Sequence, residues 1–196
     1  DLDGWSDVVV SGEPRVLMGG PGGFDVDVHE ELRFEVFGNE DDPAGIAVGD
    51  LNGDGRPDLV IGHHFNSTVD AGKQVPVRLF VNREASGGFT LDDVTVASGS
   101  PGLATKSPHV GIVDLDNDGD VEIMGDRIVV DHLGNTVFVA PAQNGPPANT
   151  AVTAADLDGD GDLELVLGQS AYHHDGTLVY ANPSITAGFP QIGNLD

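Results

Sequence analysis

The stretch 156–168 reads DLDGDGDLELVLG, and its pattern decides the fold of this chain. Residues 50–62 (DLNGDGRPDLVIG) and 114–125 (DLDNDGDVEIMG) share the pattern D-x-[DN]-x-D-G-x-x-[DE]. Each acidic turn follows a short apolar segment and precedes a strongly apolar run that ends in Gly. Short apolar runs bounded by turn residues are typical of strands. The three stretches therefore predict strand–turn–strand units that repeat along the chain.

The two ends of the chain carry pieces of the same unit. Residues 1–7 (DLDGWSD) match loop positions three to nine, and residues 193–196 (GNLD) match a strand end and positions one to three. The register predicts four repeats in one propeller domain or propeller fragment over 1–196: about 1–43, completed by 191–196, then 44–106, 107–148 and 149–190. Cuts inside a loop at both ends indicate excision from a longer array, or ends that meet in space.

Each repeat is expected to hold four short strands. In the third repeat they fall near 109–113, 121–125, 127–131 and 136–140, and in the fourth near 151–155, 163–168, 169–173 and 177–181. Hairpin turns are expected at 132–135 and 174–176, and 63–76 is an insertion in the second repeat. Repeated groups of four strands are typical of propeller blades. The predicted fold class is all-β: a β-propeller of four-stranded antiparallel blades, about four in this chain.

The acidic loops have the spacing of a hard-cation site. Side chains at alternate positions of a tight turn converge, Gly at position six permits the bend, and dense oxygen ligands select calcium over zinc or copper. Two carboxylates about 4 Å apart repel by up to about 4 kcal/mol at an effective dielectric of about 20, which disfavours an empty acidic turn. The predicted ligands are Asp50, Asn52, Asp54, Asp58 and the Arg56 carbonyl; Asp114, Asp116, Asp118, Glu122 and the Asp120 carbonyl; and Asp156, Asp158, Asp160, Glu164 and the Asp162 carbonyl. A partial N-terminal site would use Asp1, Asp3, Asp7 and the Trp5 carbonyl, so we expect three complete calcium sites and a partial fourth.

An EF-hand shares the start of this motif but not its end. It needs a bidentate Glu at position 12 and a helix on each side. Position 12 is Ile61, Gly125 or Leu167 here, and the flanking runs are of the strand type. The EF-hand interpretation therefore fails on both counts.

These loops and strands resemble the FG-GAP/VCBS class of β-propeller repeats, which also build the heads of integrin α-subunits. The resemblance covers nearly the whole chain and implies a bladed, calcium-stabilised propeller of an extracellular protein, secreted or at the cell surface. Propellers of that class usually have more blades than the four expected here. A closed four-bladed ring, an open half-propeller and a ring assembled from two chains all remain open.

Composition excludes several classes of partner and site. The formal net charge is −25, which repels phosphate backbones, so no nucleic-acid binding is expected. No apolar run approaches the ~20 residues of a membrane span, and membrane insertion is not expected. The chain has no cysteine, so metal loops would replace disulfides as cross-links. The acidic excess suits a secreted protein of a saline habitat.

Three functions remain in competition. The first is a non-catalytic module for adhesion or recognition of a protein or glycan, and the second is part of a secreted polysaccharide lyase or hydrolase. The third is an architectural segment that self-associates or pairs with the remaining blades of a longer chain. With 8 Lys and Arg scattered singly and no nucleophile motif, we expect no enzyme. Any ligand is expected on the face opposite the acidic loops, where the long connectors gather.

Overall fold

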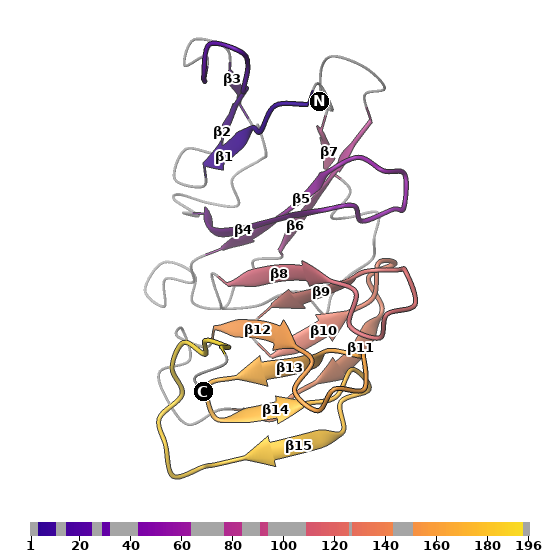
Figure 1. Cartoon of the computed structure of the whole chain (residues 1–196), viewed down its shortest axis with the longest axis vertical. Coiled ribbons are helices and arrows are strands. Elements are labelled where there is room, and N and C mark those ends of the chain that lie inside the picture. Colours follow the sequence, from indigo (N-terminus) through magenta and orange to yellow (C-terminus); the bar gives the residue numbers. More distant parts are fainter. Residues whose placement is uncertain are drawn as a thin grey trace, which may run out of the picture.

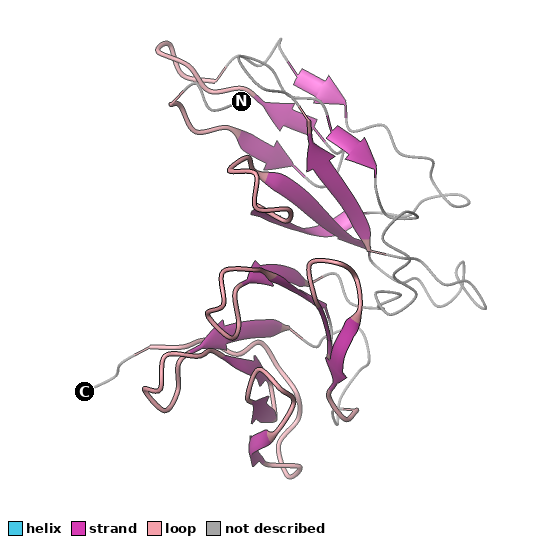
Figure 2. Cartoon of the chain, turned by 90° about the vertical axis from the view of Figure 1, so that its right-hand side faces the viewer, coloured by secondary structure: helices cyan, strands magenta, loops and turns pink. Residues whose placement is uncertain are grey.

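The computed structural model describes residues 4–10, 15–24, 29–31, 43–63, 77–83, 91–93, 109–125, 127–142 and 151–193. This part of the chain consists of strands and loops, as Figure 2 shows. The described residues contain no helix long and apolar enough to cross a membrane.

Four separate antiparallel sheets contain all of the described strands, and neighbours in sequence are neighbours in each sheet. The first sheet comprises β1 (Val8–Val10), β2 (Arg15–Leu17) and β3 (His29–Glu31). The second comprises β4 (Pro43–Gly49), β5 (Asp58–His63), β6 (Arg78–Asn82) and β7 (Leu91–Asp93). The third comprises β8 (Val110–Val113), β9 (Glu122–Gly125), β10 (Ile128–Val130) and β11 (Thr136–Val139). The fourth comprises β12 (Val152–Ala155), β13 (Glu164–Leu167), β14 (Ser170–Tyr172) and β15 (Leu178–Ala181).

The sheets form a row in sequence order, with β1 and β15 at opposite ends (Figure 1). The first strands of successive sheets contact each other, β4 with β8 and β8 with β12. This blade-like arrangement agrees with the predicted all-β class of repeated meanders. In the described part of the chain the row is open.

Apolar side chains fill the space between neighbouring sheets. The side chains of Leu59 and Ile61 pack with Val16 of the first sheet, while Val60 between them packs with Ile123 and Val130 of the third sheet. Side chains of a strand alternate between its two faces, so a second strand buried on both faces must be apolar throughout. That requirement explains the uninterrupted runs that follow every acidic loop.

The expected strands of the third and fourth repeats are confirmed to within two residues at each end. Both hairpin turns are also confirmed, with Gly134 and Gly176 at φ of 85° and 86°. Within the described residues the first sheet has three strands rather than the expected four. Its missing first strand was expected from 191–196, and the described residues 191–193 form no strand. The insertion 63–76 lies almost wholly outside the described residues.

Candidate functional site

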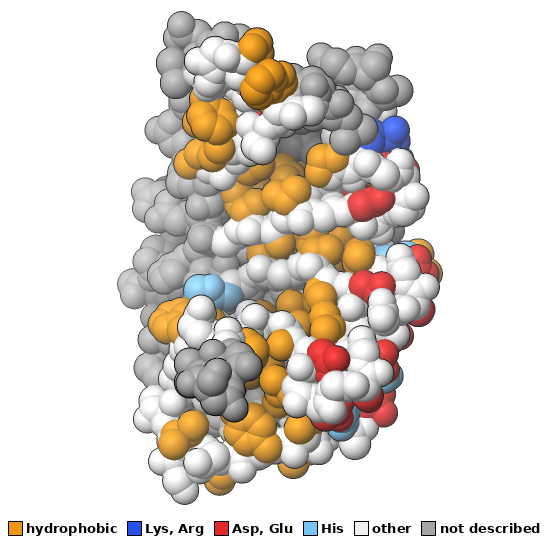
Figure 3. Space-filling model, in the orientation of Figure 1, with side chains coloured by type: hydrophobic (Ala, Val, Ile, Leu, Met, Phe, Trp, Pro, Cys, Tyr) orange, Lys and Arg blue, Asp and Glu red, His pale blue; other side chains and the backbone are white. Residues whose placement is uncertain are grey.

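The three acidic loops project from one side of the row of sheets, where the acidic side chains gather in Figure 3. Each loop joins the first and second strands of its sheet. The backbone has positive φ at loop position six, 82° at Gly55, 98° at Gly119 and 104° at Gly161. Glycine adopts this left-handed conformation without a Cβ clash, which explains the constant Gly of the motif.

The carboxylate at loop position one holds the loop backbone in its turn. Asp50 accepts hydrogen bonds from the backbone N–H groups of Asp54 and Gly55, at 3.1 and 2.7 Å. Asp114 accepts the equivalent pair from residues 118 and 119, and Asp156 accepts one from Gly159 at 2.6 Å. The loops thus form turns in which the acidic side chains fold inward over the backbone.

The carboxylate at position nine is buried in all three loops. Asp58 and Glu164 are 0% exposed and Glu122 is 8% exposed. One oxygen of each accepts a hydrogen bond from the backbone N–H of position two: Leu51 at 2.8 Å, Leu115 at 2.8 Å and Leu157 at 2.7 Å. This buried carboxylate therefore closes the base of every loop.

In the 50–58 and 156–164 loops, the other oxygen of the position-nine carboxylate contacts the end of the third strand or the residue that follows it. Asp58 Oδ1 accepts a hydrogen bond from the Asn82 N–H at 2.8 Å, and Glu164 Oε1 lies 3.1 Å from His173 Nδ1. In the first sheet Asp7 Oδ1 accepts one from the Gly19 N–H at 2.8 Å. A single carboxylate thus ties the acidic loop to a second turn on the same side of the sheet.

Several of the predicted ligands converge. One oxygen each of Asp114, Asp116 and Glu122 lie within 4.8 Å of one another, as do those of Asp156, Asp158 and Asp160. In the 50–58 loop, where position three is Asn52, no such group of three carboxylates forms among the described residues. There the Arg56 guanidinium lies 2.5 Å from Asp54 Oδ2. The oxygen-only donor sets of these loops fit a hard cation such as Ca²⁺.

Burial raises the pKa of two acids at position nine, Asp58 and Glu122. Desolvation raises the pKa of Asp58 above its ordinary 3.8, against the opposing hydrogen bonds from Asn82 and Leu51. It also raises the pKa of Glu122 above 4.5, and the neighbouring charges of Asp116 and Asp114 act in the same direction. A bound cation would offset this cost, because it favours the ionised carboxylates.

The N-terminal partial site is described only in part. Asp1 and Asp3 lie outside the described residues. The Trp5 side chain is 52% exposed, whereas Asp7 is half-buried against Gly19.

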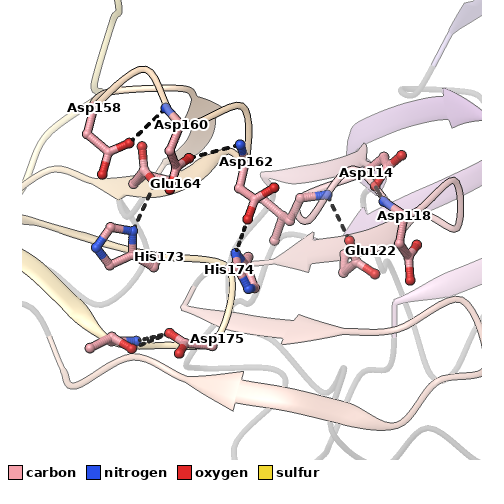
Figure 4. A network of polar contacts seen from close by, with 12 residues as sticks. Asp114, Asp118, Glu122, Asp158, Asp160, Asp162, Glu164, His173, His174 and Asp175 are labelled. Carbon is pink, nitrogen blue, oxygen red and sulfur yellow. Dashed lines mark hydrogen bonds and ion pairs between the residues drawn. The ribbon is translucent and has the colours of Figure 1, made fainter.

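Three histidines that were not among the predicted ligands face these loops. His132 Nδ1 lies 3.7 Å from Asp120 Oδ2, and His174 Nδ1 lies 3.2 Å from Asp162 Oδ2. His173 contacts Glu164, as Figure 4 shows. Taken alone, the residue pattern indicates only polar strand ends at 173–174. The available signal was topological, since alternating strand direction places the turns at 132–135 and 174–176 on the side of the acidic loops.

A comparison with family models matches residues 43–73 to the FG-GAP repeat. This chain contains an FG-GAP repeat. The matched segment spans β4, the 50–58 loop and β5, so the family motif coincides with the loop and its two strands. The resemblance inferred from the sequence is thereby confirmed. The comparison with curated protein sequences found no match.

Two solved structures are similar to this chain in the arrangement of their sheets. The V. cholerae biofilm matrix protein Bap1 matches 97% of this chain with a TM-score of 0.58 and 19% sequence identity. The exotype rhamnogalacturonan lyase YesX matches 92% with a TM-score of 0.55 and 19% identity. The chain spans only 28% and 31% of those two proteins. At this identity the likeness shows a shared, propeller-like fold.

Proposed function

We propose that this chain is a calcium-stabilised β-propeller module of an extracellular protein, secreted or at the cell surface, which binds a protein or glycan without catalysis. The observation that carries the proposal is the common geometry of the three acidic loops. Each combines a buried position-nine carboxylate with further acidic side chains above it, and all three lie on one side. Similarity to a biofilm matrix protein over 97% of the chain supports a role outside the cell.

Calcium acts structurally in this proposal. Side-chain oxygens at positions one, three, five and nine and the carbonyl at position seven would hold each ion. Three ions contribute six positive charges and would change the formal net charge from −25 to −19. Extracellular calcium modules bind with Kd values of about 10⁻⁴ to 10⁻³ M, so occupancy would follow the calcium level outside the cell.

Thermal unfolding tests the metal role directly. The Tm is measured in millimolar Ca²⁺, in millimolar Mg²⁺ and in excess EGTA. We expect a rise of several degrees with Ca²⁺ and a smaller one with Mg²⁺, because Mg²⁺ dehydrates reluctantly and demands octahedral geometry. The double variant Asp114→Asn/Asp116→Asn serves as the matched control and should lose part of the rise. A Tm that is equal in Ca²⁺ and EGTA would refute the calcium proposal.

The row of four sheets is open in the described part of the chain. The end sheet exposes apolar side chains on β15, with Leu178 and Tyr180 at 55% and 44%, because no further sheet covers this strand. We propose that further blades of a longer chain, or a second copy, cover these ends. Light-scattering mass in calcium distinguishes them: a dimer supports ring completion by two copies, and a monomer supports completion by a longer chain.

The ligand is expected on the side opposite the acidic loops. A cavity of about 670 Å³ extends between β11 and the β14–β15 hairpin, from Gly176 on the acidic side to Pro141 and Pro183 of the connectors on the opposite side. Binding of the intact chain to arrays of glycans and matrix proteins tests recognition. The variant Leu178→Glu, which alters the wall of the cavity, should reduce binding there. Turnover of an acidic pectic polysaccharide would instead favour the lyase alternative, which the fold shared with YesX keeps open.

A further inference from the structure

The turn between β14 and β15 brings an imidazole ring to the 156–164 loop. His173 Nδ1 lies 3.1 Å from Glu164 Oε1, and one ligand atom each of Asp158, Glu164 and His173 lie within 4.8 Å of one another. Glu164 is fully buried, and its other oxygen accepts the Leu157 N–H. Figure 4 shows the ring of His173 turned toward the loop.

The other repeats use this turn differently. In the second sheet Asn82 contributes its backbone N–H to Asp58, so the position-nine acid meets a main-chain group. In the third sheet the corresponding residue is Asp131, whose carboxylate accepts hydrogen bonds from the N–H groups of Leu133 and Asn135 within its own turn. Among the described residues, only the 156–164 loop therefore has an imidazole nitrogen within a group of three convergent ligand atoms.

A second histidine of the same turn lies at the rim of this loop. His174 Nδ1 lies 3.2 Å from Asp162 Oδ2, the side chain at loop position seven. The turn between β14 and β15 thus presents two imidazole rings to the 156–164 loop, of which His173 belongs to the group with Asp158 and Glu164.

We propose that the 156–164 loop holds a transition-metal ion, of which Zn²⁺ is the model, on Asp158, Glu164 and His173 in preference to the third Ca²⁺ assigned above, while the 50–58 and 114–122 loops take Ca²⁺. Imidazole is a preferred ligand of Zn²⁺, Cu²⁺ and Ni²⁺, whereas Ca²⁺ takes oxygen ligands almost alone. Three protein ligands with mixed nitrogen and oxygen atoms leave a position for water, as in other open zinc sites. The inference deepens the proposed metal function of the acidic loops and rests on it for the two calcium sites only.

Titration calorimetry of the full chain with Zn²⁺ in millimolar Ca²⁺ tests the proposal. We expect about one Zn²⁺ per chain that Ca²⁺ does not displace. His173→Gln should weaken this binding by at least about tenfold, since even the loss of an outer partner of a metal ligand costs that much. His132→Gln, a histidine at the matching turn of the third sheet, is the control and should leave binding unchanged. Equal Zn²⁺ affinity in wild type and His173→Gln, or full displacement by Ca²⁺, would overturn the proposal.

Zinc-edge X-ray absorption of the wild-type chain gives a readout that does not depend on the folding of a variant. The expected spectrum contains imidazole scattering together with oxygen ligands. A spectrum with oxygen ligands only would overturn the assignment of His173. The calcium proposal has its own test, because a Tm that does not respond to Ca²⁺ would refute it. That result would not change how the Zn²⁺ titration is interpreted.

Discussion

At the scale of single residues, the position-nine carboxylate links metal binding to folding. Asp58 is buried and accepts two backbone hydrogen bonds, one from its own loop and one from the last residue of β6. Its removal would leave buried N–H groups without partners even where no ion is present. The same residue is thus a predicted ligand and a structural clamp. In calcium-free protein only the hydrogen bonds of the clamp remain, so their contribution to stability can be measured by itself.

Asp58→Asn is predicted to destabilise the calcium-free chain by about 1–3 kcal/mol. The amide keeps the shape of the carboxylate but turns a donor toward either the Leu51 or the Asn82 N–H. Urea unfolding in EGTA measures the effect. Asp116→Asn, at an exposed position, is the control and should change stability by less than about 0.5 kcal/mol. Equal stability of Asp58→Asn and wild type would contradict the clamp.

Glu122 is predicted to make the calcium-free chain more stable as pH falls from neutral toward 4.5. Burial raises its folded pKa above the ordinary 4.5, with the charges of Asp116 and Asp114 adding to the effect. Between the ordinary and the raised pKa the folded chain holds a proton that the unfolded chain has released, so stability falls as pH rises through this window. Wild type should therefore gain stability relative to Glu122→Gln as pH falls through this window.

Calcium should reverse the sign of this pH dependence. A bound ion favours the ionised carboxylate and lowers its folded pKa below that of the unfolded chain. The contribution of Glu122 is then present above the ordinary pKa and is lost as pH falls. Denaturant titrations of both proteins at several pH values, with and without Ca²⁺, measure the two slopes. The same slope in both conditions would argue against an ion at Glu122.

At the scale of elements, the second strand of each complete sheet is the structural centre of its repeat. Both faces of β5, β9 and β13 are covered, by neighbouring sheets or by the segments that follow them. The segment after β15 returns across the fourth sheet. The Gln169 side-chain amide donates to the Ile185 carbonyl, and residues 187–188 pass over Gly168 at the turn between β13 and β14. This path leads from the outer strand back across the sheet, as a connector to a further blade would.

Gly168→Ala is predicted to displace the segment 183–193 from the fourth sheet. A Cβ at this position would overlap the backbone nitrogen of Gly188, and backbone cannot move aside as a flexible side chain can. Limited proteolysis should cut the variant faster within this segment, with a fall in Tm. Gly188→Ala is the control, because no atom lies within 4 Å of the new methyl group. Equal cleavage rates in the two variants would contradict the packing.

At the scale of the whole molecule, charge and shape act together. The acidic loops of three sheets lie along one side of the row, so much of the net charge of −25 is concentrated there. Self-repulsion of this kind destabilises a compact state unless cations screen or bind it. Bound calcium and dissolved salt should therefore each reduce the repulsion between the acidic loops.

Added NaCl is predicted to raise the Tm of the calcium-free chain more than that of the calcium-loaded chain. The screening length falls from about 10 Å at 0.1 M to about 3 Å at 1 M, which weakens repulsion between neighbouring loops. Calorimetric scans over this range with EGTA or Ca²⁺ compare the two. Choline chloride at equal ionic strength controls for specific sodium binding. A Tm that is independent of salt in EGTA would show that repulsion between the loops is negligible.

The sequence alone determined the repeated sheets, the hairpin turns and the acidic loops. These features depend on local patterns: Gly at position six permits positive φ, and the runs after each loop are apolar because neighbouring residues face opposite sides of a buried strand. Their register could be predicted because it repeats. The burial of single aromatic residues could not, since Tyr180 is 44% exposed on β15, which no described sheet covers.

Only the tertiary structure decided what surrounds each loop. His173 is nine residues from Glu164 in sequence, and the two meet because β13, β14 and the turn after them fold back into one sheet. The same fold brings Asn82 to Asp58 across 24 residues. Residue types and spacing indicate which groups are able to bind a cation. The path of the backbone determines which of those groups meet, because side chains distant in sequence come within bonding distance only when the strands between them pair.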